Sequence, residues 1–143
     1  MSSSPCALCA ADGGEVIFRD DLLRVVLVDE PDYPGFVRVI ANAHVREMTD
    51  LPRAPQQRLL EAVFVVEQAQ RQVLAPHKIN LASLGNMTPH LHWHVIPRFA
   101  DDANFPETVW GKRQREPDRQ RLAERRARLG ALRAAIAAGL VAA

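Results

Sequence analysis

The sequence predicts an α+β fold, on the strength of five short β-rich segments and one long amphipathic helix between the third and the fourth. The β-rich segments, in chain order, are 15–19, 22–29, 36–41, 79–84 and 90–99. Turn residues separate the first three, Asp20-Asp21 and then a cluster of proline and glycine at 31–35. We therefore expect the chain to open with an antiparallel meander.

The long helix is predicted from hydrophobic periodicity. It begins near Pro52 or Pro55, since proline is tolerated in a first turn, and Pro76 ends it. Apolar residues recur within it at spacings of three and four: Leu59, Leu60, Val63, Phe64, Val66 and Val73. This pattern predicts a helix lying on a sheet. A second, basic helix is expected over 117–129, with Gly130 as a break before an alanine-rich continuation.

Length and composition are ordinary for a single globular domain. The chain has 143 residues, of which 48% are hydrophobic and 24% are charged. A bilayer span needs about 20 apolar residues, and no stretch here is that long. The first residues do not combine a basic region with a long apolar run, so we expect no signal peptide. We expect a cytoplasmic protein without a membrane partner.

Charge is unevenly distributed along the chain. Segment 112–133 holds nine basic and three acidic residues, although the net charge of the whole chain is only +1. Such asymmetry can mark a surface for nucleic acid or another anionic partner. A solvated helix face is the interpretation we favour over nucleic-acid binding.

The two cysteines form a single Cys6-x-x-Cys9 pair. In a cytoplasmic protein this spacing suggests metal binding or redox chemistry rather than a structural disulfide. A redox pair would be expected at the start of a helix after a strand, and only a short N-terminal segment precedes this one. Structural zinc, a pair without metal and a redox pair all remain open.

The most informative stretch contains three of the five histidines at alternate positions: His90, His92 and His94. Alternate side chains of a strand share a face, so the three imidazoles should line one side. Leu91, Trp93 and Val95 should then face the core. Three imidazoles in register are poorly explained by packing. They could share a metal ion, or one could attack an electrophile while its neighbours handle protons and charge.

The run from His90 to Ile96 resembles the His-φ-His-φ-His-φ-φ motif of the histidine-triad nucleotide-binding superfamily, φ being apolar. Segment 33–44 is similar to that family's Pro-Gly-His-x-Leu-Val-x-Pro-Lys-x-His segment, and 49–51 to the lead-in of its helix. The resemblance covers about 6–111. It implies a HIT domain over 1–111, with 1–14 as an N-terminal Cys-x-x-Cys segment and 112–143 as a helical extension.

The resemblance also implies a homodimer, a five-stranded antiparallel sheet in each subunit and an active site at the triad. The family's middle histidine is its nucleophile, which corresponds to His92, and His94 and His90 complete the catalytic set. Asp29 is expected to bind the ribose hydroxyls, since a carboxylate can accept both cis-diol protons. Asn86 and Thr88 are candidates for phosphate contacts, and Phe18, Leu27 and Ile40 for pocket walls. The loop 85–89 is shorter than in most of the family, which leaves the leaving group open.

A structural zinc site needs four ligands, and the Cys-x-x-Cys pair supplies two. Some members of the family complete a Cys2His2 site at positions that correspond to His44 and His90. We therefore expect Cys6, Cys9, His44 and His90 as metal ligands, with zinc attaching the N-terminus to the sheet. No catalytic cofactor is expected.

The predicted function is a nucleotide hydrolase or transferase. Its substrate would be a dinucleoside polyphosphate or a nucleoside phosphoramidate, attacked at the α-phosphorus to give a nucleotidyl-histidine intermediate. Two alternatives remain. One is a regulatory protein that binds nucleotide without turnover, and the other is a metal-dependent hydrolase with the three histidines as ligands.

Overall fold

The computed structural model describes residues 5–143, so the first four residues of the predicted segment 1–14 lie outside the described part. Five strands form one antiparallel sheet in the order β1-β2-β3-β5-β4. They are β1 (Glu15–Arg19), β2 (Leu23–Leu27), β3 (Val37–Ala41), β4 (Lys78–Ala82) and β5 (His92–Arg98). The predicted α+β class and five-stranded antiparallel sheet are confirmed.

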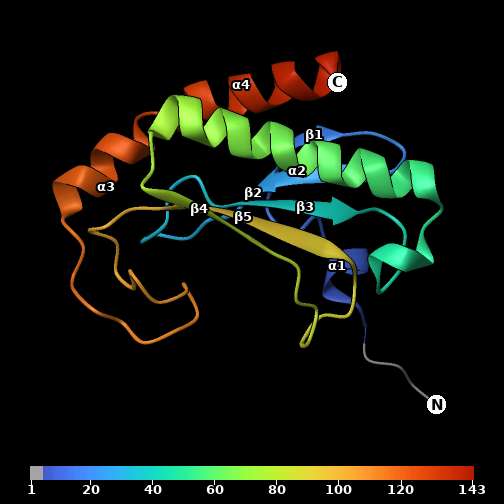
Figure 1. Cartoon of the computed structure of the whole chain (residues 1–143), viewed down its shortest axis with the longest axis horizontal. Coiled ribbons are helices and arrows are strands. Elements are labelled where there is room, and N and C mark those ends of the chain that lie inside the picture. The colour runs from blue at the N-terminus through green and yellow to red at the C-terminus, as the bar shows by residue number, and fades with distance from the viewer. Residues whose placement is uncertain (1–4) are drawn as a thin grey trace.

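Helices lie on both faces of this sheet, but very unequally. The long α2 (Arg53–Leu74) and the C-terminal α4 (Leu129–Ala142) cover one face, and the single-turn α1 (Ala7–Ala10) lies at the other (Figure 1). A 3-10 turn, η1 (Met48–Asp50), leads into α2, and α3 (Arg119–Arg126) precedes α4. On the face away from α2, α1 packs at one end of the sheet and the loop after β5 packs at the other.

The main core lies between the sheet and the α2–α4 layer. Strand residues of one parity enter it, and from the histidine strand these are Leu91, Trp93 and Val95, as the alternation predicts. His92 and His94 consequently point to the opposite face. The register β2–β3–β5 aligns Val26, Arg38 and His94 in one row and Arg24, Ile40 and His92 in the next.

The strand ends differ from the sequence prediction where the chain leaves the regular sheet. β5 begins at His92 rather than residue 90, because the Leu91 amide donates to Val45, in the loop after β3, at 2.7 Å. β4 ends at Ala82 rather than residue 84, since Ser83 turns its hydroxyl to the His92 carbonyl. β1 matches the predicted bounds.

The prediction for the C-terminal helices was wrong about where the break falls. α3 ends at Arg126 and α4 starts at Leu129, so Gly130 lies inside α4. A Cβ at Gly130 would meet nothing within 4 Å, and the apolar face of α4 packs on α2 regardless of the glycine. Tertiary packing here outweighs the weak helix propensity of one residue.

The segment 112–143 packs into the same core as the strands. Leu132, Ile136 and Leu140 of α4 are buried in the main cluster. Several of its arginines form ion pairs with carboxylates: Arg113, Arg121, Arg125 and Arg133. These contacts favour the interpretation of the basic segment as a structural face rather than a surface for nucleic acid.

Among the helices of residues 5–143, none combines the length and the apolar character that crossing a membrane requires.

Candidate active site

His92 is fixed on the sheet face away from α2 with one ring nitrogen already committed. Its Nδ1–H donates to the carbonyl of His90, with 2.5 Å between nitrogen and oxygen. Because a neutral imidazole carries one proton, this bond leaves the lone pair on Nε2. The Ser83 hydroxyl donates to the His92 carbonyl at 2.8 Å, which holds the strand backbone at the same residue. The arrangement suits a nucleophile whose orientation is set before substrate arrives.

His94 lies beside His92 in an aromatic enclosure. Its ring centroid is 4.9 Å from that of His92, 5.7 Å from Phe36 and 5.0 Å from Trp110. Burial, and then the charges of His92 and Arg38, lower the pKa of His94 to about 4. His94 is thus neutral at pH 7. Its Nδ1 is buried and has no hydrogen-bond partner within residues 5–143, which is uncommon for a buried polar atom.

The predicted metal ligands meet at the other end of the histidine strand. The ligand atoms of Cys6, Cys9, His44 and His90 all lie within 4.8 Å of one another. Nδ1 of His90 is 3.3 Å from the Cys6 sulfur, 3.5 Å from the Cys9 sulfur and 3.3 Å from Nδ1 of His44. The Cys9 sulfur and Nδ1 of His44 are 3.4 Å apart.

These separations fit a tetrahedral metal ion. Zn–S bonds of about 2.3 Å and Zn–N bonds of about 2.0–2.1 Å place tetrahedral ligands roughly 3.3–3.8 Å apart. His90 directs Nδ1 into the cluster, while its Nε2–H donates to the Ala41 carbonyl at 2.6 Å. A backbone carbonyl that fixes the tautomer in this way is the usual support of a metal-binding histidine. The donor set and its geometry fit zinc.

Both ring nitrogens of His90 are therefore engaged, Nδ1 in the cluster of cysteines and histidines and Nε2 with a backbone carbonyl. The sequence prediction had given this residue a catalytic role as well as a metal-binding one. In the structure its side chain lies in the cluster, and its carbonyl accepts the hydrogen bond from Nδ1–H of His92.

Arg24 anchors the cysteine segment to the sheet. Its guanidinium donates to the carbonyl of Leu8 in α1, to the carbonyls of Ala11 and Asp12 just after α1, and to the side-chain oxygen of Asn42. Arg24 is 5% exposed, so these bonds replace the water that a buried guanidinium would otherwise need. The sequence reasoning missed this residue.

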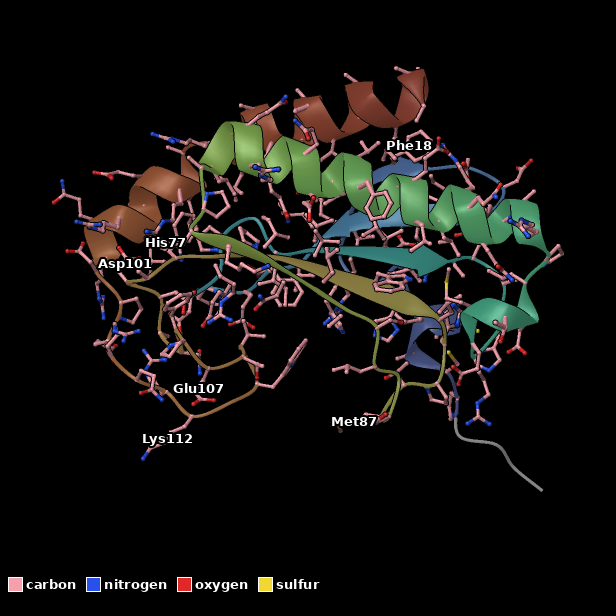
Figure 2. The ribbon with its side chains drawn as sticks, viewed as in Figure 1. Phe18, His77, Met87, Asp101, Glu107 and Lys112 are labelled. Atoms are coloured by element: carbon pink, nitrogen blue, oxygen red, sulfur yellow. The ribbon has the colours of Figure 1, made fainter. Side chains whose placement is uncertain are left out.

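The predicted substrate contacts lie in two different loops, one after β2 and one between β4 and β5. Asp29 is exposed and lines a cavity of about 490 Å³ together with Arg126 and Arg133. Asn86 and Thr88 lie in the loop between β4 and β5, on the side of the sheet away from α2, where Figure 2 shows Met87 at the tip. That loop returns to His90, whose amide donates to the Thr88 carbonyl at 2.8 Å.

The three predicted pocket walls do not form a pocket beside the histidines. Phe18 packs against the core on the α2 side, because β1 has a bulge between Val16 and Phe18 that shifts its register (Figure 2). Leu27 belongs to the same α2-facing core and reaches only the cavity of Asp29. Ile40 is on the histidine face but is fully buried beneath Leu8 of α1.

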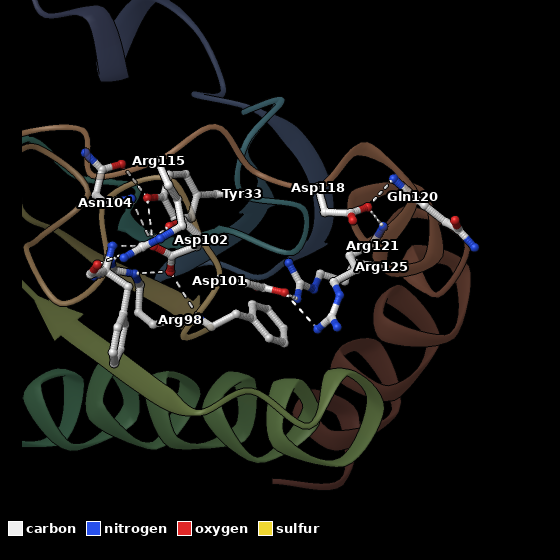
Figure 3. A network of polar contacts seen from close by, with 12 residues as sticks. Tyr33, Arg98, Asp101, Asp102, Asn104, Arg115, Asp118, Gln120, Arg121 and Arg125 are labelled. Carbon is white, nitrogen blue, oxygen red and sulfur yellow. Dashed lines mark hydrogen bonds and ion pairs between the residues drawn. The ribbon is translucent and has the colours of Figure 1, made fainter.

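The loop after β5 carries Trp110 to His94, and a buried polar network holds that loop (Figure 3). Asp102 accepts two bonds from Arg98, at 2.8 and 3.0 Å, and further bonds from the amides of Phe99, Asn104 and Phe105. Arg98 also donates to the Glu107 carbonyl at 2.7 Å. The last residue of β5 thus organises the enclosure around His94.

Two further residues on the histidine face were missed by the sequence reasoning. Phe36 packs its ring against His94, and Arg38 stands directly opposite His94 in the β3–β5 register. A sequence signal for Arg38 existed, since it is the one charged residue within the apolar run of β3.

Comparisons with known proteins agree with this geometry. Residues 12–101 match the model of the HIT domain family. The chain is 28% identical to the solved histidine triad protein blr8122 of Bradyrhizobium japonicum, with a TM-score of 0.74, covering 93% of this chain and 97% of that one. It is 25% identical to a Zn-bound histidine triad family protein of Mycobacterium smegmatis, with a TM-score of 0.58 and coverages of 91% and 96%.

Curated relatives are longer proteins. A Mycobacterium tuberculosis protein named AP-4-A phosphorylase is 30% identical over 106 residues, which is 70% of this chain and 54% of that protein. A Schizosaccharomyces pombe bis(5'-nucleosyl)-tetraphosphatase is 28% identical over 105 residues, 70% of this chain and 58% of its own length. The chain thus spans little more than half the length of these relatives. The family model covers most of the chain, including the triad, and the chain belongs to the HIT domain family.

Proposed function

We propose that this chain is a nucleotide hydrolase or transferase that attacks the α-phosphorus of its substrate with Nε2 of His92. The observation that carries the proposal is the bond from Nδ1–H of His92 to the His90 carbonyl, which leaves the lone pair on the outward nitrogen. The names of the curated relatives favour a dinucleoside polyphosphate as substrate. A nucleoside phosphoramidate is the second substrate class.

In the first step, Nε2 forms a bond to the α-phosphorus while the bond from phosphorus to the leaving group breaks. The electron pair of that bond departs with the leaving group. The imidazole becomes cationic in the nucleotidyl-histidine, and the His90 carbonyl stabilises that charge through the Nδ1–H bond. His94 is neutral, so one of its nitrogens carries a proton that it can donate to a phosphate oxygen.

In the second step, water or another acceptor attacks the same phosphorus and His92 leaves with its lone pair. Two displacements replace one difficult step with two easier ones. We propose Asn86 and Thr88 as phosphate contacts, because their loop leads directly into the histidine strand and is hydrogen-bonded to the amide of His90. Asp29 remains our proposed ribose contact. We further propose a homodimer, in which the exposed apolar Leu81 of the edge strand β4 would be covered.

Zinc, held by Cys6, Cys9, His44 and His90, would cross-link α1 to the sheet and stiffen the backbone that orients His92. It would supply no electrophile to the reaction. A hydrolase that uses the three histidines as ligands is disfavoured, since Nδ1 of His92 is bonded to a carbonyl and only His90 of the three belongs to the metal-binding cluster of residues 5–143.

The test is mass spectrometry of the protein mixed with diadenosine tetraphosphate or with a slowly reacting adenosine phosphoramidate, then quenched. We expect an adenylyl group on a peptide that contains His92, and loss of turnover by a factor of about 10⁴ or more in His92→Ala, as expected when a covalent nucleophile is removed. His77→Ala is the matched control, because His77 is exposed and lies in the turn between α2 and β4. It should retain full activity.

The same samples separate the alternatives. Turnover that persists during brief treatment with a chelator excludes a catalytic metal, and an adduct on another histidine overturns the assignment of His92. Nucleotide binding without any adduct or product identifies a non-catalytic binding protein instead.

A further inference from the structure

Arg38 is a cation beside the triad whose environment offers it few partners. It lies in β3 opposite His94, on the same face of the sheet. Its Nη1 donates to the Gly13 carbonyl at 3.2 Å, and its guanidinium lies 5.9 Å from the centre of the Phe36 ring. Its Nε is buried and has no hydrogen-bond partner among the described residues. Of five N–H donors, the structure uses one.

The comparison with Arg24 shows how unusual this is. Arg24 lies on β2, on the same face and one row away, and its donors bond to three carbonyls and an amide oxygen. Arg24 is therefore explained by the fold, since it attaches the cysteine segment to the sheet. Arg38 makes one such bond and, within residues 5–143, no ion pair closer than 4 Å.

Placing a half-buried guanidinium there costs free energy. Burial lowers the pKa of Arg38, and the nearby charge of Glu30 only partly opposes that effect. An apolar residue would fill the position at lower cost, as Val26 and Ile40 do on the same face. Buried polar atoms without partners are uncommon, and those that persist often belong to sites that a ligand completes.

The position of Arg38 indicates which part of a ligand it would meet. Nε2 of His92 addresses the α-phosphorus, and Arg38 lies one row farther along the sheet, next to His94. When the bond from the α-phosphorus breaks, the electron pair moves to the leaving group. A polyphosphate leaves with one additional negative charge, whereas a protonated amine leaves neutral. Only the first product gains from a guanidinium, whose planar fork matches phosphate oxygens.

We propose that Arg38 binds the phosphate chain of the leaving group, so that this site favours nucleotides whose leaving group is a polyphosphate over those whose leaving group is an amine. The inference rests on the proposed function and deepens it by naming the substrate class.

The test compares Arg38→Gln and Arg38→Lys with wild type on two substrates, diadenosine tetraphosphate and an adenosine phosphoramidate. For Arg38→Gln we expect kcat/KM on the tetraphosphate to fall by about 10- to 100-fold, the range for a lost hydrogen bond to a charged group. On the phosphoramidate we expect a change below about threefold, within the range of a neutral substitution. Arg38→Lys keeps the charge without the fork and should lie between.

Arg19→Gln is the matched control, because Arg19 is an exposed arginine of β1 whose only ion pair within residues 5–143 is with Asp12. It should leave both substrates unchanged. If Arg38 only holds the loop at Gly13, Arg38→Gln will lower the melting temperature and depress both substrates equally, which would overturn the inference. Equal activity of Arg38→Gln and wild type on the tetraphosphate would also overturn it.

A binding measurement separates this inference from the proposed function. By calorimetry, wild type should bind adenosine triphosphate about tenfold or more tightly than adenosine monophosphate, and Arg38→Gln should lose that difference. This readout needs no turnover. An absent adduct on His92 with the affinity difference intact refutes only the catalytic proposal, whereas an adduct without the difference refutes only the role of Arg38.

Discussion

At the scale of single residues, the site depends on keeping His94 neutral. It is enclosed by Phe36, Trp110 and His92, and its pKa lies near 4, well below the ordinary value of 6.5. A charged His94 would repel both Arg38 and a cationic His92 intermediate. Neutrality of this ring is therefore part of how the face can hold Arg38 so close to His92, the proposed nucleophile.

This neutrality predicts a pH dependence of stability. Between pH 6.5 and about 4 the unfolded chain binds a proton at His94 that the folded chain does not bind. The contribution of this residue is therefore complete above pH 6.5 and is lost as the pH falls toward 4. His94→Gln cannot take up that proton. The free energy of unfolding, measured with urea at pH 7 and pH 4.5, should fall more steeply in wild type than in the variant.

His77→Gln removes an exposed imidazole and should follow wild type. Comparing variants that all retain the cysteine cluster cancels the loss of metal at low pH. Parallel pH profiles for wild type and His94→Gln would contradict the assignment.

At the scale of elements, the sequence revealed the histidine face but not what surrounds it. Alternation alone predicts that His92 and His94 share a side, because a strand has a period of two. It does not predict that β1 has a bulge, which turns Phe18 to the α2 side, or that Leu8 of α1 covers Ile40. Those placements depend on contacts between segments far apart in the chain. Contacts between distant segments also distinguish the two arginines. The guanidinium of Arg24 donates four hydrogen bonds, whereas that of Arg38 donates one.

The loop after β5 is another element that tertiary contacts define. Arg98 is 2% exposed and Asp102 1%, and burial of that carboxylate is offset by the bonds it accepts from Arg98 and from backbone amides (Figure 3). Burial also raises the pKa of the neighbouring Tyr33 to about 12, so its hydroxyl stays protonated and donates. The sequence placed Arg98 in a strand without indicating this network.

We expect Arg98→Met to destabilise the protein by about 3–5 kcal/mol, because it leaves Asp102 buried without its charged partner. The free energy of unfolding in urea measures this effect. Trp110 is already 53% exposed, and loosening of the loop should release it from His94 and expose it further, which acrylamide quenching of fluorescence would detect in a Trp93→Phe background. Arg113→Met breaks an exposed ion pair with Asp32 and should cost no more than about 1 kcal/mol. Equal losses in the two variants would refute a special role for the buried network.

At the scale of the whole molecule, the two faces of the sheet differ in what they carry. One face is closed by α2 and α4, and it holds the main core (Figure 1). The other face carries the cluster of Cys6, Cys9, His44 and His90, and it also carries His92, His94 and Arg38 in adjacent rows. Strands buried on one side and functional on the other allow a rigid core to position reacting groups without giving up core volume.

The two-faced arrangement makes a prediction about the C-terminal helix α4, which lies outside residues 12–101, the part that matches the family model. Ile136 of α4 is fully buried between α2 and the sheet. Ile136→Ala should therefore lower the free energy of unfolding of the entire chain by about 2–5 kcal/mol, the usual cost of a cavity in a core. Urea unfolding followed by circular dichroism and by tryptophan fluorescence should give one coincident transition.

Val141 is exposed at the end of the same helix, and Val141→Ala should change stability by less than about 0.5 kcal/mol. If α4 were a detachable appendage, Ile136→Ala would instead leave the fluorescence transition of the sheet in place, and only part of the helical signal would melt early.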